Sequence, residues 1–150
     1  EQDRIFNELE VSVLGLYELH LEYAARFNRS EKNIVFSALH KDLPFAFLQL
    51  LCDLGVENTY INIWKRLIDM RLKEYGEHFK LAYKESKKER EFQAHEEELR
   101  ITWARIETIT IDCLTHIRRG DVHADDPLWK LLRKWLIMLD VQIASIESHL

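Results

Sequence analysis

Apolar residues recur every three or four positions along most of this chain, a spacing that predicts long amphipathic helices. Residues 2–27 carry the widest apolar stripe, because a second set of apolar positions runs beside the first. A stripe of this width predicts a helix that contacts more than one neighbour. The two sets are Phe6, Leu9, Val13, Leu16, His20, Ala24 and Phe27, and Val11, Leu14, Tyr17 and Leu21. We expect His20, on this apolar face, to be a hydrogen-bonded core histidine.

The segment after residue 27 is predicted to hold two helices. Residues 28–30 indicate a break, after which Ser30 can cap a short helix to about Leu39. The sequence at 42–44, Asp-Leu-Pro, predicts a second start, because Asp accepts free amides and Pro loses nothing in a first turn. This second helix ends at Gly55 and is very apolar, so we expect it to be buried on most sides.

Two longer helices should follow. Asn58 or Thr59 is expected to cap the first, which has a heptad-like apolar seam. In the charged stretch beyond this seam we predict a turn near residues 85–91, because one helix from 59 to 119 would far exceed typical lengths. Another helix then runs from about 93 to 119. The seam consists of Ile61, Trp64, Ile68, Leu72, Tyr75, Phe79 and Ala82.

The last helix has clear start signals. Gly120 ends the preceding helix, Asp125 or Asp126 is the expected cap, and Pro127 opens the new helix. Its seam is Leu128, Leu132, Trp135, Leu139, Ile143, Ile146 and Leu150. The chain has only four Gly and two Pro, and turn signals do not recur at the spacing typical of β proteins. We therefore predict one all-α domain over residues 1–150, an antiparallel bundle of five or six helices.

Composition narrows the classes of partner. Hydrophobic residues make up 47% of the chain, which excludes disorder, and the net charge of −5 disfavours direct DNA binding. Cys52 and Cys113 lack the spacing of a disulfide or zinc motif, so we expect two free, buried thiols. The sequence shows neither a leader nor an uninterrupted apolar run of membrane-spanning length. These features predict a cytoplasmic protein that does not bind membranes.

The chain lacks the usual motifs for a metal, a cofactor or covalent catalysis. None of the histidines has a Glu three residues earlier, as a di-iron bundle requires. Glu74 with His78, and Glu91 with His95, are four residues apart, and we interpret them as solvated side-chain pairs. A phosphate loop and a nucleophile elbow are also missing. We therefore predict no cofactor and no metal, and an enzymatic role is not favoured.

The segment 118–123, Arg-Arg-Gly-Asp-Val-His, resembles the Arg-x4-6-His signature of HEPN-type helical ribonucleases and toxins. The resemblance implies metal-independent RNA cleavage, in which His123 moves a proton and Arg118 stabilises the phosphorane charge. The sequence departs from the family at Arg119, where Asn is common, and at Gly120, which interrupts the helix. Arg71 with His78, and Arg90 with His95, match the same spacing by chance.

A longer stretch, residues 106–139, resembles the helical effector-binding (TipA-like) domains found behind MerR-type DNA-binding domains. A helix ending at Gly120, the loop up to Asp126-Pro127, and the segment 131–136, Leu-Leu-Arg-Lys-Trp-Leu, carry this likeness. It implies a non-enzymatic domain that binds a small ligand and regulates transcription. Residues 1–60 do not fit the pattern.

The aromatic residues favour this second interpretation. Aromatic side chains between helices commonly hold a flat apolar ligand. We therefore predict a regulatory domain that binds a small apolar or aromatic ligand, or a partner helix, with ribonuclease activity as the alternative and a helical dimerisation module as the third. The wide stripes of the first and last helices predict a homodimer. The predicted ligand-binding residues are Tyr75, Phe79, Trp103 and Trp135.

Overall fold

The protein is all-α, as its sequence predicts. The computed structural model describes residues 1–27, 32–88 and 97–149, and within them five helices and no strand are present. The helices are α1 (Gln2–Phe27), α2 (Lys32–Asp53), α3 (Asn58–Ser86), α4 (Glu97–Arg118) and α5 (Pro127–Glu147).

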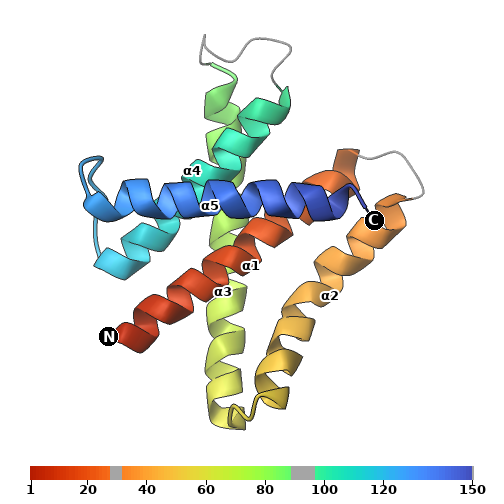
Figure 1. The fold of residues 1–150 in the computed structure, drawn as a ribbon, viewed down its shortest axis with the longest axis vertical. Helices are drawn as coiled ribbons and strands as arrows, with labels where there is room; N and C mark the ends of the chain where they lie inside the picture. The colour runs from red at the N-terminus through yellow and green to blue at the C-terminus, as the bar shows by residue number, and fades with distance from the viewer. Residues whose placement is uncertain (28–31, 89–96, 150) are drawn as a thin grey trace.

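Helix α1 is the centre of the bundle. It packs against each of the other four helices, which confirms that its wide apolar stripe serves several neighbours. Helices α3 and α4 pack against each other, and α5 lies across α1 and α4 (Figure 1). Among the described helices, α2 contacts α1 and α3 alone, and its end projects away from α4 and α5 together with the start of α3 (Figure 1).

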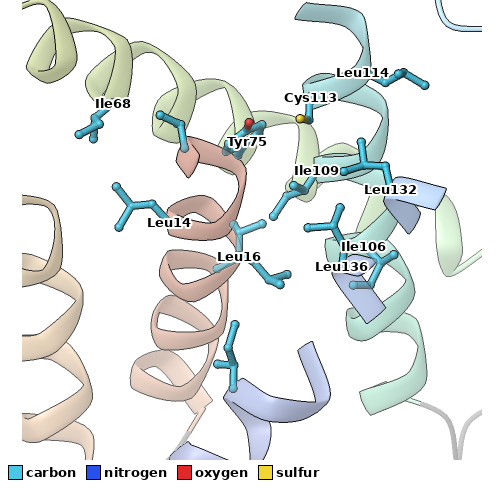
Figure 2. Packing of buried hydrophobic residues seen from close by; sticks show 13 residues of the cluster. Leu14, Leu16, Ile68, Tyr75, Ile106, Ile109, Cys113, Leu114, Leu132 and Leu136 are labelled. Atoms are coloured by element: carbon cyan, nitrogen blue, oxygen red, sulfur yellow. The ribbon is translucent and has the colours of Figure 1, made fainter. Parts of the chain in front are cut away.

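The core forms where α1, α3, α4 and α5 meet (Figure 2). Tyr75 is fully buried at its centre, and Gly15 of α1 lies directly against the tyrosine ring. A Cβ atom added to Gly15 would lie 2.4 Å from Tyr75 Cδ2, so only glycine allows the two helices to approach this closely. The remaining buried members of this cluster are Val11, Leu14, Leu16, Leu19, Ile68, Ile106, Ile109, Cys113, Leu114, Leu132, Leu136 and Ile143.

Helix α2 differs from the prediction in two respects. It is continuous from Lys32 to Asp53 with Pro44 inside it, so the predicted helix start at 42–44 is wrong. Pro44 lacks an N–H, and the helix gives up the hydrogen bond to the carbonyl of His40. The prediction of burial is also wrong, because α2 presents one side to α1 and α3 and leaves Phe45 and Leu50 largely exposed.

The composition of α2 also matches that of a membrane-spanning helix. Residues Ile34–Asp53 have a mean hydropathy of 1.3, and 6% of this window is buried inside the protein. Core helices of many proteins have the same length and composition, so this property alone assigns no membrane role.

Several predicted helix ends are confirmed. Gly55 has a φ of +88°, which only glycine adopts without strain, and it follows α2 as expected. Asp126 caps α5 by accepting a hydrogen bond from the Leu128 N–H at 2.9 Å, with Pro127 in the first turn. Helix α3 ends at Ser86, within the turn predicted for 85–91, and the expected start of the next helix at residue 93 lies outside the described residues.

Two other ends differ from the prediction by one residue. Glu57 rather than Asn58 or Thr59 precedes α3, and its side chain makes no capping hydrogen bond. After α4 the left-handed conformation falls on Arg119, at a φ of 57°, instead of Gly120. The Gly120 N–H still closes the helix end by donating to the Thr115 carbonyl at 3.2 Å.

Candidate functional site

An apolar groove lies where the first turns of α1, the last turns of α4 and the first half of α5 meet. Its cavity volume is about 300 Å³, at the small end of the range for ligand pockets. All eight residues that line it are apolar, and Leu131 is the most exposed of those on α5. They are Ile5, Leu9, Leu114, Ile117, Leu128, Leu131, Leu132 and Trp135.

Polar contacts at its rim hold the walls of this groove together. The Arg4 guanidinium donates to the carbonyl oxygens of His116 at 2.5 Å and Ile117 at 3.0 Å, which ties the start of α1 to the end of α4. These carbonyls belong to the last turn of α4, where intrahelical donors run out. On the other side, the Asp126 cap fixes where α5 begins. The groove is therefore bounded by helix ends that are held in place.

The structure separates the four predicted ligand-binding residues. Trp135 lines the groove, whereas Tyr75 is fully buried in the core between α1, α3 and α4. Phe79 packs on the edge of the core and stacks on Tyr83, with ring centroids 6.2 Å apart. Trp103 lies half-buried on α4. Only Trp135 among them contributes to the groove.

Arg118 and His123 occupy the connection from α4 to α5. The Arg118 guanidinium donates two hydrogen bonds of 2.8 Å to the Asp126 carboxylate, which is also the cap of α5. This pairing raises the pKa of Arg118 and lowers that of Asp126. His123 is exposed in the same loop. Arg118 thus has a structural partner, and the similar pair Arg90 and His95 lies outside the described residues.

A second, polar site connects α1, α3 and α4. Arg71 donates to both carboxylate oxygens of Glu8, at 2.9 and 2.7 Å, and its guanidinium lies 3.7 Å from Glu74. The Glu74 carboxylate lies 2.8 Å from His116 Nε2, and one turn further along α3, His78 Nδ1 lies 2.7 Å from the Asp112 carboxylate. We refer to Glu74, His78, Asp112 and His116 as the histidine–carboxylate cluster.

Burial dominates the electrostatics around this cluster. It raises the pKa of Asp112, although the hydrogen bond with His78 acts in the opposite direction. The nearby Glu74 charge adds to the rise. Burial also raises the pKa of Tyr75 well above its usual value, and the tyrosine hydroxyl has no hydrogen-bond partner among the described residues. A negative charge on the Asp112 carboxylate or the Tyr75 hydroxyl is therefore poorly compensated by its surroundings.

A third polar group is structural. His20 Nε2 lies 2.6 Å from the Asp140 carboxylate, and Arg105 donates to the same carboxylate at 2.8 and 3.2 Å. All three side chains are buried, which confirms the prediction of a hydrogen-bonded core histidine. Burial alone would raise the pKa of Asp140, but the bonds from His20 and Arg105 outweigh it and lower the pKa. This group links α1, α4 and α5.

The two cysteines are free, as predicted, but only one is buried. Cys113 lies in the core, where burial raises the pKa of its thiol to about 12. A thiol of this kind is protonated at neutral pH and chemically inert. Cys52 is exposed near the end of α2, so the prediction of burial is wrong there.

Sequence reasoning missed the histidine–carboxylate cluster, although it noted the spacing of Glu74 and His78. Asp112 and His116 have the same spacing on α4, and that repetition is the signal that could have revealed the site. Comparison of the chain with models of protein families, with curated proteins and with solved structures gives no match. The function must therefore be argued from the sites themselves.

Proposed function

We propose that this chain is a non-enzymatic binding domain, and that the apolar groove between α1, α4 and α5 takes a small apolar or aromatic molecule. The observation that carries the proposal is the groove itself, about 300 Å³ in volume and lined by apolar residues alone. Binding of an apolar ligand to an exposed hollow of this kind is favourable, because the ligand displaces water from apolar surface. The volume suits a compact ring system better than a long chain.

The resemblance to effector-binding domains supports the same site. Six of the eight lining residues, all except Ile5 and Leu9, fall within the segment 106–139 that carries the resemblance. The remaining two come from α1, which packs against each of the other four helices. A ligand in the groove would therefore favour one packing of α1 against α4 and α5. It can shift that equilibrium only by its difference in affinity between the packings.

The test uses 1-anilinonaphthalene-8-sulfonate, whose bicyclic ring suits an apolar groove, with Trp135 as an intrinsic reporter. We expect saturable, micromolar binding to the wild-type chain and a change in tryptophan emission. Leu131→Glu places a charge in the groove wall at an exposed position and should weaken binding at least tenfold.

Met138→Glu is the matched control. Met138 lies two turns after Leu131 on the same helix, is similarly exposed at 62% against 65%, and does not line the groove. Its substitution should leave dye binding unchanged. Absence of saturable binding to the wild-type chain, or equal loss in both variants, would refute the proposal.

Homodimer formation is a second candidate property, favoured by the large apolar side chains that α2 leaves exposed. A chain that dimerises can still bind a ligand, so the two proposals are compatible.

A further inference from the structure

The histidine–carboxylate cluster consists of two matching pairs on adjacent helices. Glu74 and His78 are one turn apart on α3, and Asp112 and His116 are one turn apart on α4. Residues four apart project from the same side of a helix. Since α3 and α4 pack against each other, the four side chains meet in the interface between them.

The donor atoms are close enough to share one ion. Glu74, His78 and Asp112 each offer one ligand atom, and these atoms all lie within 4.8 Å of one another. His116 lies outside this set of three, but its Nε2 is 2.8 and 3.0 Å from the two oxygens of the same Glu74 carboxylate, which makes it the nearest fourth ligand on α4. Ligand atoms around a tetrahedral zinc ion are about 3.3 Å apart, as bond lengths near 2.0–2.2 Å require. Small side-chain rotations would close the remaining difference.

The charges of the site favour a dication. Arg71 neutralises Glu8, to which it donates both of its hydrogen bonds. Within the part of the chain that the structure describes, the close partners of the Glu74 and Asp112 carboxylates are histidines, with Arg71 more distant at 3.7 Å from Glu74. With neutral imidazoles, the cluster therefore carries two negative charges that one divalent cation would balance.

Access and ligand chemistry agree with this interpretation. The Asp112 side chain is 8% exposed and anchors the site inside, whereas the His78 side chain is 47% exposed and leaves a route from solvent. Two imidazole nitrogens and two carboxylate oxygens suit zinc and related first-row ions, while magnesium prefers oxygen ligands alone.

We propose that Glu74, His78, Asp112 and His116 bind one divalent transition-metal ion of the zinc type between α3 and α4. This proposal replaces the expectation from sequence that the chain has no metal site. It is independent of the apolar groove, because none of the four residues lines that groove. In the ion-free protein, each imidazole lies within hydrogen-bond distance of the carboxylate beside it. A bound metal would take the place of these hydrogen bonds, with each neutral imidazole keeping its proton on the nitrogen that does not bind the ion.

The first experiment is calorimetric titration of the untagged chain with Zn²⁺, repeated with Mg²⁺. We expect one Zn²⁺ per chain with micromolar or tighter affinity, and little binding of Mg²⁺. Co²⁺ should give the intense visible absorption of a tetrahedral nitrogen–oxygen site.

Variants decide whether these four residues are the ligands. His78→Gln and Glu74→Gln remove one ligand each at partly exposed positions, and each should weaken Zn²⁺ binding at least tenfold. His123→Gln changes an exposed histidine of the loop before α5 and should leave binding unchanged.

Circular dichroism of each variant checks that it is folded. The proposal is overturned if the wild-type chain binds no Zn²⁺, or if folded His78→Gln and Glu74→Gln bind it as tightly as the wild type. In either case the cluster is a set of ion pairs that hold α3 to α4.

Discussion

At the scale of single residues, the closest constraint on packing is the contact between Gly15 and Tyr75. The tyrosine is fully buried and its ring lies where any β-carbon on residue 15 would have to go. A core packed at crystal-like density cannot absorb such an overlap without moving a helix or forcing the ring off its rotamer. The same sequence contains a second helical glycine, Gly76, next to Tyr75 but facing open space.

We expect Gly15→Ala to destabilise the protein by about 1–2 kcal/mol. The overlap with Tyr75 costs about 1–3 kcal/mol, and the better helix propensity of alanine recovers up to about 1 kcal/mol. Gly76→Ala should instead stabilise the protein by about 0.5–1 kcal/mol, because it gains propensity without any contact within 4 Å. Urea unfolding followed by circular dichroism measures both. A Gly15→Ala variant as stable as Gly76→Ala would contradict the close approach of α1 and α3.

Some residues could be read from sequence alone and others could not. His20 was predictable as a core histidine because its apolar surroundings on α1 leave only burial and a hydrogen bond as a stable solution. Its partners, Asp140 and Arg105, were not predictable, since they are far from it in sequence. For the same reason, the sequence alone indicated a solvated pair for Glu74 and His78. In the fold, Asp112 and His116 of α4 lie beside them.

At the scale of elements, the predictions succeeded where a helix end depends on local chemistry. Gly55 and the Asp126-Pro127 start are signals that act within one turn, so they hold whatever the tertiary structure. Pro44 is the exception, because its ring penalises a helix only on the preceding turn and packing can outweigh that penalty. Helix α2 continues through it, with Phe36 buried before the expected break and Leu43, Phe47 and Leu48 packed against the core after it.

The continuity of α2 makes a testable claim about Pro44. Inside a helix, proline leaves the carbonyl four residues earlier without its donor and crowds it, at a cost of about 3 kcal/mol. We therefore expect Pro44→Ala to raise the free energy of unfolding by about 1–3 kcal/mol and to increase the helical signal in circular dichroism. If residues 42–44 instead begin a new helix, proline is in its favoured first-turn position. The substitution would then be neutral or destabilising, which would contradict a single α2.

At the scale of the whole molecule, the sequence predicted the fold class and the central role of α1 but not the placement of α2. An apolar helix of this composition looks like a core element, yet only α1 and α3 cover it. A stripe pattern says which side of a helix is apolar and not how many neighbours exist to bury it. The apolar groove could not be predicted either, because it forms only where the start of α1 packs against the consecutive helices α4 and α5, about 100 residues further along the chain.

In the structure, the reason to expect a homodimer differs from the one that the apolar stripes suggested. The stripe of α1 is used inside the bundle, so it no longer argues for a second copy. Large apolar side chains are exposed on α2, in the turn after it and at the start of α3, and exposed apolar surface of this kind often marks an interaction site. These side chains are Ile34, Val35, Leu39, Phe45, Leu50, Leu54, Tyr60 and Ile63. Helix α5 also keeps large apolar residues exposed.

We expect the chain to dimerise through this α2 surface. Light scattering and sedimentation over a range of concentrations should give twice the chain mass of 18.0 kDa for the wild type. The double variant Phe45→Asp/Leu54→Asp places charges at two exposed positions of the surface and should give the monomer mass with an unchanged helical signal. Leu99→Asp changes another exposed leucine, on α4, and should leave the dimer intact. A wild-type chain that stays monomeric would contradict the dimer. So would a monomer whose α2 surface binds phosphatidylcholine vesicles, so that the chain floats with them in a flotation assay.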